Sequence, residues 1–544
     1  MSVPPRPDLL PAIMALMEEK GHLSGVDVEA VARRLRIPAS LVYGFYNQFA
    51  EFPTQAGRPM VTLCAGPACA AAEQGWNREK WVGRLRAGAH VATLPGLARP
   101  HNPPALVVRL PGESARLVQG FREPELERLV MALERRDLST YPLSEEPLSP
   151  VWPDYAAQGS SPWLASLAGG ELPGSFGPDA VREISREPGR LLKILKGEGR
   201  SEGEPATLGP PDALICDTVG PSPESGVDLL VSLFHPRAVA AGSLLAAAAL
   251  RAPRVAFYVP WDRPELGERI LEAAGETAAG TGIRCEVVRG PAYIPCFRET
   301  GVAATLQGMM LWRAASICGR DGPLRLRPPL AVFGAFSLWR VPWLVEAGGS
   351  GGEGKERMTL MAQAPGSPPR WLEVPARLSG EELSRLLEGA WVKGQSGPKA
   401  YYLEGITNKL YSADAAEVEI PSGTRRLLVL DQSVCMARWA LRLLEAGAES
   451  CCGGCAPGRT AAAAAAAMLK SATRRADLET ELRRTAEVLR GAEELALCPC
   501  LGEYTSPVRA CLESFSEDFR IYLEGEDCPA PVGVEPGRAT RMGG

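Results

Sequence analysis

Cysteines near the carboxyl end are the residues whose spacing most directly indicates chemistry. Cys452 and Cys455 are separated by two glycines, and Cys498 and Cys500 flank a single proline. A Cys-x-x-Cys pair places two thiolates within reach of one metal centre, and the glycines let the backbone turn tightly around it. The second pair would complete four soft ligands, a number that suits both zinc and a [4Fe–4S] cluster. Thiols that bind no metal are the other interpretation.

The cysteine count favours a metal or cluster over disulfides. The chain has 14 cysteines, and eight of them lie between Cys435 and Cys528. The first residues, with early prolines and an acidic helical segment, lack the basic start and apolar core of a signal peptide. Without export to an oxidising compartment, we expect clustered cysteines to bind metal.

Another cysteine pair, Cys64 and Cys69, lies nearer the amino terminus and directly follows the short apolar segment 59–63. Four intervening residues with a central glycine suit one side of a [2Fe–2S] cluster. A full site needs two more ligands, and no cysteine occurs between Cys69 and Cys216, while His101 stands alone. We therefore expect a vestigial or structural thiol pair and no [2Fe–2S] cluster.

A glycine-rich stretch, residues 196–204, is the third candidate site. Gly197 and Gly199 follow Lys196, a combination that can cradle a phosphate group. The acidic residues in the stretch repel phosphate, and the dinucleotide-binding spacing is absent, so a plain surface loop is the alternative. With only four histidines in the chain, hydrolytic general-base chemistry has little to work with.

The elements that must position these residues predict an α/β protein of several domains. Residues 1–140 begin with helices and continue with strands at 59–63 and 105–110, which indicates a small α/β unit. Residues 141–180, rich in Pro, Ser and Gly, predict a linker. Residues 181–347 alternate strands and helices, as in a layered α/β domain. We interpret 348–425 as a β-grasp-like insert and 426–544 as a mostly helical domain that carries the cysteines.

Charge and hydropathy exclude several classes of partner. The net charge of −5, without a basic run, gives no electrostatic footprint for nucleic acid or an anionic membrane. The longest weakly polar run, 238–250, is shorter than the roughly 20 residues that span a bilayer. We expect a soluble cytoplasmic protein with no direct membrane insertion.

Residues 1–140 resemble the thioredoxin-like ferredoxin subunit of the complex I NADH module. The resemblance rests on the helical start, on the aromatic segment 42–49 and on the Cys64 and Cys69 pair. That family has a second cysteine pair further along, whereas the corresponding stretch here, 93–101, contains none. The missing pair again argues against a [2Fe–2S] cluster.

Residues from about 180 to the end resemble the flavoprotein subunit of the same module, which also occurs in soluble NAD-linked hydrogenases and formate dehydrogenases. Segment 449–459, Glu-Ser-Cys-Cys-Gly-Gly-Cys-Ala-Pro-Gly-Arg, matches the family's Glu-Ser-Cys-Gly-x-Cys-x-Pro-Cys-Arg. Residues 289–294 and 298–300 resemble its Gly-Ala-Gly-Ala-Tyr-Ile and Gly-Glu-Glu-Thr segments. The resemblance implies a thioredoxin-like domain, a flavoprotein-like domain and a helical [4Fe–4S] domain. It also implies FMN and NAD contacts at Gly197, Gly199 and Glu299.

Departures from the family pattern affect both cofactors. The flavin loop is reduced to 197–203, the acidic run has become 218–221, one family Glu is Arg298, and the paired Asn are Trp343 and Leu344. Each change removes a hydrogen bond or a close backbone approach that FMN needs, so we predict impaired FMN and NADH binding.

At the cluster, the third family cysteine is Gly458, and the fourth falls at Cys498 or Cys500. The extra cysteine of that pair, or Cys451, could replace the missing ligand. The predicted ligand set is Cys452, Cys455, Cys498 and Cys500.

These observations favour an iron–sulfur electron-transfer subunit that works with other subunits of an oxidoreductase complex. The folded flavin domain would then serve as scaffold and docking surface. An active FMN-dependent NADH:acceptor oxidoreductase is the first alternative, and a non-catalytic structural subunit is the second.

Overall fold

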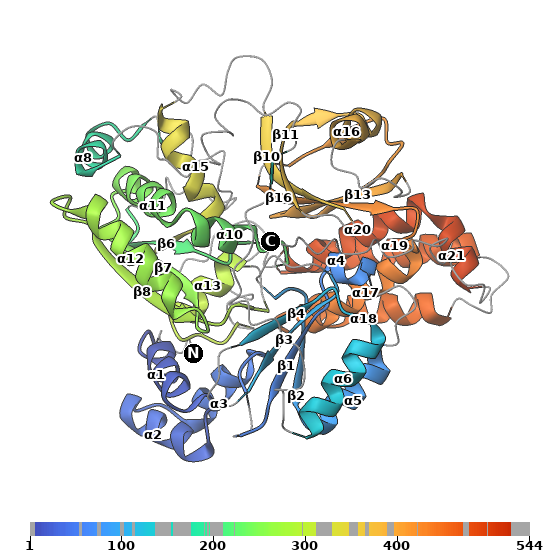
Figure 1. The fold of residues 1–544 in the computed structure, drawn as a ribbon, viewed down its shortest axis with the longest axis horizontal. Helices are drawn as coiled ribbons and strands as arrows, with labels where there is room; N and C mark the ends of the chain where they lie inside the picture. Colours follow the sequence, from blue (N-terminus) through green and yellow to red (C-terminus); the bar gives the residue numbers. More distant parts are fainter. Residues whose placement is uncertain are drawn as a thin grey trace, which may run out of the picture.

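Within the residues that it describes, the computed structural model contains four β-sheets and many helices (Figure 1). The residues that it describes are 6–53, 57–72, 78–97, 103–110, 115–135, 154–155, 176–189, 191–192, 195, 210–221, 224–295, 298–311, 329–346, 357–364, 369–388, 397–421, 423–471, 478–497 and 499–523. Gly197, Gly199 and Cys498 therefore lie outside the described residues.

A four-stranded parallel sheet organises the central part of the chain. Its order is β8-β7-β6-β9, formed by β6 (Ala213–Asp217), β7 (Arg254–Pro260), β8 (Arg284–Gly290) and β9 (Leu330–Gly334). Side chains alternate along β6, so Leu214 and Cys216 enter one core while Ala213 and Ile215 enter another. Helices cover the first face, namely α10 (Val227–Phe234), α11 (Pro236–Leu250), α12 (Pro264–Ala278) and α15 (Ala335–Glu346), with α8 (Pro178–Arg186) beside α11.

The second face of this sheet is covered by the N-terminal helices. These are α1 (Leu9–Lys20), α2 (Gly25–Leu35) and α3 (Ala39–Asn47), joined by α13 (Arg298–Leu306). The Arg6 N–H donates to the Gln307 carbonyl at 2.6 Å, and Gly308 leaves room for this strap because a Cβ there would lie 2.1 Å from the Arg6 carbonyl oxygen. The helices that we predicted as the start of the first unit thus complete the core of the central sheet.

The sheet formed by residues 60–119 has the order β2-β1-β3-β4. It consists of β1 (Met60–Cys64), β2 (His90–Leu94), β3 (Ala105–Arg109) and β4 (Arg116–Gln119), with α4 (Pro67–Ala72) after β1. Val61 and Leu63 point to the core formed with α5 (Arg78–Gly88) and α6 (Glu123–Glu134). Strand alternation sends Thr62 and Cys64 to the opposite face, which turns towards the rest of the molecule.

The largest sheet has six strands in the order β14-β13-β16-β10-β11-β5. They are β5 (Asp154–Tyr155), β10 (Arg357–Gln363), β11 (Arg370–Pro375), β13 (Pro398–Gly405), β14 (Lys409–Ser412) and β16 (Thr424–Asp431). Helix α16 (Gly380–Leu387) covers one face, and β12 (Arg377–Leu378) pairs with β15 (Val418–Glu419) beside it. Strand β16 crosses the boundary predicted at residue 425, and β5 lies within the segment predicted as a linker.

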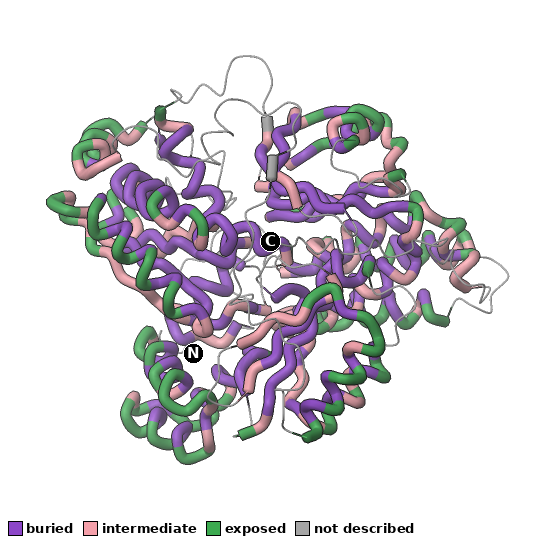
Figure 2. Tube along the Cα trace, in the orientation of Figure 1, coloured by how far each residue is buried: buried purple, intermediate pink, exposed green. Residues whose placement is uncertain are grey.

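The C-terminal helices cover the other face of the six-stranded sheet. They are α17 (Met436–Ser450), α18 (Ala456–Ser471), α19 (Leu478–Leu495), α20 (Cys500–Ser514) and α21 (Ser516–Leu523). Leu428 and Leu430 of β16 enter their shared core, whereas Leu427 and Val429 face α16. Figure 2 shows that the central strands of the sheets and the inner helix faces are buried, while the outer turns of α2, α5 and α12 are exposed. The edge strands β4, β8 and β9 are mostly half-buried.

No single helix within the described residues is long and apolar enough to cross a membrane. Helices α10 and α11 reach the required length and hydropathy only as a pair, which is bent by 106°.

The close packing of α11 on α15 gives a test of the central core. A Cβ on Gly242 would lie 1.8 Å from the carbonyl oxygen of Leu338, so Gly242→Ala must push the two helices apart. We expect the free energy of unfolding to fall by about 1–3 kcal/mol. Urea unfolding followed by circular dichroism measures the change.

Gly275→Ala in α12 is the matched control, because no atom lies within 4 Å of a Cβ at that position. This variant should be neutral or more stable by about 0.5–1 kcal/mol, since alanine is the better helix former. Equal destabilisation by both substitutions would contradict the proposed role of the close helix contact.

Candidate functional site

The cysteine-bearing connections lie at one end of the C-terminal helical bundle. Cys451, Cys452 and Cys455 occupy the turn between α17 and α18, and Cys500 is the first residue of α20. Short connections join neighbouring antiparallel helices, so the end of α17 and the start of α20 fall at the same end. The buried Tyr293 side chain interacts with both connections: burial and the Cys500 thiol raise the pKa of its hydroxyl, and a hydrogen bond with Ser450 lowers it.

We refer to the turn 451–455 together with Gly458 as the cysteine turn. Gly453 has a positive φ of 72°, and its N–H points to the Cys451 Sγ at 3.3 Å. The Gly458 N–H, in the first turn of α18, points to the Cys455 Sγ at 3.4 Å. A Cβ built on Gly458 would lie 3.0 Å from the sulfur of Cys451 and 3.0 Å from that of Cys455.

The chemistry of the cysteine turn suits thiolate ligands of an iron–sulfur cluster. Backbone N–H groups directed at sulfur, together with the positive end of α18, stabilise negative charge on these atoms. Contact with the Cys452 thiol, together with burial, raises the pKa of the Cys451 thiol. Among the described residues, no set of three or more His, Cys, Asp or Glu side chains converges closely enough to hold a metal ion. Because Cys498 lies outside them, the set Cys452, Cys455, Cys498 and Cys500 stays a prediction.

Cys64 and Cys69 share a small core with Leu97, Ala105 and Val107. Both cysteines are buried, with exposed fractions of 2% and 0%. Arg78 donates to the Cys64 carbonyl, and the Trp439 Nε1–H of α17 donates to the Pro67 carbonyl at 3.2 Å. The segment around the pair is therefore packed directly on the helical bundle.

The carboxyl ends of β6 and β9 form the topological switch point of the parallel sheet, where α/β proteins bind ligands. Asp217 ends β6, and its two carboxylate oxygens accept from Arg298 at 2.7 and 2.9 Å. Arg298 donates a third hydrogen bond to the Ala292 carbonyl at 2.7 Å. Both side chains are almost fully buried, and Glu299 lies beside Arg298 in the first turn of α13.

A second buried pair lies next to the first. Asp228 of α10 accepts from Arg425 of β16 at 3.1 Å and from the Phe336 N–H at 2.8 Å. Behind it, Trp343 packs in a buried aromatic cluster with Trp339, Phe336 and Trp371. Four buried charged side chains near this end of the central sheet are thus paired with one another.

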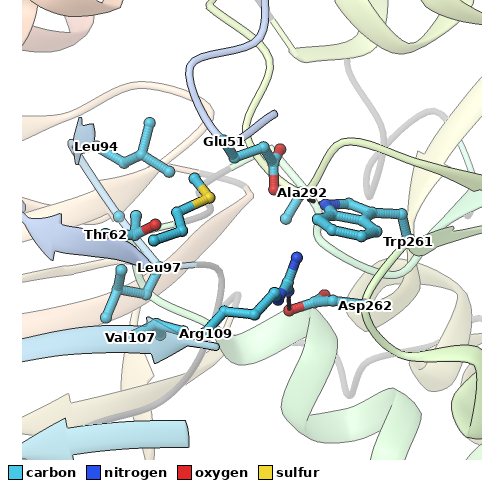
Figure 3. A pocket seen from close by; sticks show the side chains of 11 residues that line it. Glu51, Thr62, Leu94, Leu97, Val107, Arg109, Trp261, Asp262 and Ala292 are labelled. Carbon is cyan, nitrogen blue, oxygen red and sulfur yellow. Dashed lines mark hydrogen bonds and ion pairs between the residues drawn. The ribbon is translucent and has the colours of Figure 1, made fainter. Parts of the chain in front are cut away.

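A small cavity of about 40 Å³ lies where the β2-β1-β3-β4 sheet meets the loops of the central sheet (Figure 3). Arg109 of β3 pairs with Asp262 at 3.0 Å and stacks over the Trp261 ring at 3.9 Å. Glu51, which follows α3, accepts from the Tyr293 N–H at 2.9 Å and from the Trp261 Nε1–H at 3.3 Å. Burial raises the pKa of Glu51 to about 7.

Sequence reasoning missed Glu51, the Asp217–Arg298 pair and the position of the Cys451 sulfur. The partners of Glu51 and Asp217 are remote in the chain, so no local pattern reveals them. For Cys451 the signal was present, since it directly precedes the Cys-x-x-Cys pair.

Comparisons with known proteins relate the chain to NADH dehydrogenase components. Residues 438–522 match the family described as NADH-ubiquinone oxidoreductase-F iron-sulfur binding region. The solved structure of an NAD+-reducing [NiFe]-hydrogenase in the H2-reduced state covers 97% of this chain and 94% of its own chain, with a TM-score of 0.73 and 17% identity. That likeness confirms the mixed α/β fold.

More specifically, the chain is similar to the F subunit of NADH-quinone oxidoreductase. The Streptomyces coelicolor protein of that name is 21% identical over 398 residues, which are 67% of this chain and 87% of that protein. A Rhizobium meliloti relative, the F 2 subunit of the same enzyme, is 23% identical over 401 residues, 65% of this chain and 91% of that protein. The resemblance to the flavoprotein subunit that we predicted is confirmed.

The Asp217–Arg298 pair should stabilise the fold only as a pair. Arg298→Met leaves the Asp217 carboxylate buried without its partner, so we expect the free energy of unfolding to fall by about 3–5 kcal/mol. The double variant Asp217→Asn/Arg298→Met removes both charges and should recover most of this loss. Urea unfolding measures the free energy of unfolding of both variants. Equal losses of stability in the single and the double variant would contradict the coupling between the two charges.

Glu51 should make stability fall as pH rises. Its pKa is about 7 when folded, against an ordinary value of 4.5, so between these values the folded state binds more protons than the unfolded state. The contribution of protonated Glu51 to the free energy of unfolding is complete below pH 4.5 and is lost by pH 7. This loss is on the order of 3 kcal/mol. Unfolding midpoints at both ends of this range measure it.

Glu51→Gln should remove this part of the pH dependence, whereas the exposed Glu29→Gln should leave it intact. The quantity to compare is the change in stability with pH, because the amide also weakens one of the two hydrogen bonds to Glu51. An unchanged pH profile in Glu51→Gln would refute the assignment.

Proposed function

We propose that this protein is an iron–sulfur electron-transfer subunit of a larger oxidoreductase. The observation that carries the proposal is the meeting of two cysteine-bearing connections at one end of the helical bundle. That bundle is also the region that matches the iron–sulfur binding family. A [4Fe–4S] cluster bound there would accept and pass on single electrons.

The cysteines of both connections would hold the cluster. The sequence assigns Cys452, Cys455, Cys498 and Cys500 as ligands, with Cys451 directly beside them. The N–H groups of the cysteine turn would stabilise charge on the sulfurs, and the buried Tyr293 and Tyr504 rings would limit the access of water. Both effects tune a reduction potential.

The charged pairs at the switch point support the second part of the proposal, which is that FMN and NADH binding are impaired. A flavin there would have to displace the Asp217–Arg298 pair and leave buried charges without partners. FMN and NAD contacts from Gly197, Gly199 and Glu299 belong to the alternative, an active NADH:acceptor flavoenzyme. The experiment below also tests that alternative, because the relatives are named as subunits of NADH-quinone oxidoreductase.

The thioredoxin-like unit would act as a docking element without a cluster. Its buried Cys64 and Cys69 support a structural role, since their sulfurs are enclosed by Leu97, Ala105 and Val107. Other subunits of the complex are the proposed partners, because the relatives are named as subunits. We place the complex in the cytoplasm. Within this chain, the proposed domains are 1–140, 181–347, 348–425 and 426–544.

Anaerobic purification of the full chain tests the function. We expect about four iron and four sulfide per chain, a reduced-state EPR signal and no flavin absorbance. Added FMN should show no saturable fluorescence quenching, and NADH should not reduce the protein. Bound flavin bleached by NADH would establish the flavoenzyme instead. Zinc without sulfide would exclude electron transfer, and a protein free of iron, zinc and flavin would indicate a structural subunit.

A further inference from the structure

The cavity in Figure 3 lies on the boundary between two sheets. One wall comes from the strands β1, β2 and β3, and the other comes from the loops after α3, β7 and β8. The charged side chains of its lining are Glu51, Arg109 and Asp262, so two carboxyl groups face one guanidinium group. We refer to these three side chains together with Trp261 as the charged joint.

We infer that the charged joint is a proton-controlled switch, in which Arg109 pairs with Asp262 while Glu51 is protonated and turns towards Glu51 when the proton is released. This inference goes beyond the proposed function and requires neither a cluster nor a flavin. It makes the contact between the β2-β1-β3-β4 sheet, which is the proposed docking element, and the central sheet respond to pH.

The contacts in the structure correspond to the protonated state. Arg109 pairs with Asp262 at 3.0 Å and stacks on the Trp261 ring at 3.9 Å. Glu51 accepts from the Nε1–H of the same tryptophan at 3.3 Å and from the Tyr293 N–H at 2.9 Å. Both of these donors are neutral, so the joint assigns its guanidinium group to Asp262 and leaves Glu51 without a cation.

Loss of the Glu51 proton makes this assignment unfavourable. Glu51 is buried, and an ionised carboxylate held only by neutral donors is costly in such a place. The charge of Asp262 repels the new charge, whereas that of Arg109 attracts it. Because burial raises the pKa of Glu51 to about 7, the proton is released near neutral pH.

The other titratable groups around Glu51 are held by partners of their own. Arg298 of α13 donates twice to Asp217 of β6. The Tyr258 hydroxyl of β7 donates to a backbone carbonyl at 2.8 Å, and burial holds its pKa well above the usual range, so it stays neutral. Arg109 is therefore the cation that can answer the charge on Glu51.

The cavity supplies the space that a change of partner needs. Figure 3 shows the Glu51 carboxyl group and the Arg109 guanidinium group projecting into it from opposite walls. Its volume of about 40 Å³ exceeds the roughly 10–15 Å³ that one water molecule requires. A close-packed core would hold the guanidinium group in place, whereas this space lets it turn.

Double-mutant cycles on the full chain test the exchange of partners. Arg109→Met, Asp262→Asn and the double variant are unfolded in urea at about pH 5.5 and about pH 8.5, which gives the coupling energy between the two positions. We expect this coupling to fall at least about twofold at the higher pH, because Arg109 then leaves Asp262. In chains that also carry Glu51→Gln, the coupling should be equal at both pH values.

Trp261 provides a second measurement, which remains available if one variant folds poorly. In protein labelled with fluorotryptophan, Trp261→Phe identifies its fluorine NMR resonance. We expect this resonance to shift with a midpoint near pH 7 in the wild type and to stay constant in Glu51→Gln. Asp262→Asn should lower the midpoint by about one pH unit and Arg109→Met should raise it by about as much, since they remove opposite charges.

The exposed Glu29→Gln is the control and should leave the coupling and the resonance unchanged. Equal coupling at both pH values in the absence of Glu51→Gln would overturn the inference. A midpoint that does not move in opposite directions in Asp262→Asn and Arg109→Met would overturn it as well. Neither result bears on the proposed function, which the iron, sulfide and flavin content of the purified chain decides separately.

Discussion

The alternating direction of the C-terminal helices is the constraint on which the cysteine site depends. Cysteines at 451–455 and at 500 are separated by two long helices, α18 and α19, in the chain. They lie at the same end of the bundle because α18 and α19 are antiparallel, so α19 ends near the start of α18. Apolar residues of these helices form one core with β16, and this core fixes their direction. The site is thus produced by packing and not by local sequence.

Buried ion pairs join the separate sheets into one body. The Arg425 side chain extends from β16 of the six-stranded sheet and donates to Asp228 of α10. The neighbouring Arg426 pairs with Glu404 within the sheet at 2.6 Å. Removing such charges from water is costly, so each pair adds little net stability and mainly fixes which surfaces meet. The Asp217–Arg298 pair extends this pattern to the switch point of the central sheet. Charged side chains thus pair with one another at the end of the sheet where open α/β sheets bind ligands.

Sequence reasoning recovered the regular elements, because their periodicity is local. The strands predicted at 59–63 and 105–110 agree with β1 and β3 in the structure. The packing of the N-terminal helices could not be predicted, since the apolar face of α1 would suit any sheet. Arg298 was recognised as a departure from the family pattern, but its partner Asp217 lies 81 residues away. The cysteine turn was found from spacing alone, whereas the direction of each sulfur required the backbone.

Two glycines, Gly453 and Gly458, set the geometry of the cysteine turn at the start of α18. A Cβ at position 458 would lie 3.0 Å from the Cys451 sulfur, so this sulfur would have to shift slightly to admit a side chain there. The positive φ of Gly453 allows the turn to fold back, so a sulfur that precedes the loop can reach the start of α18.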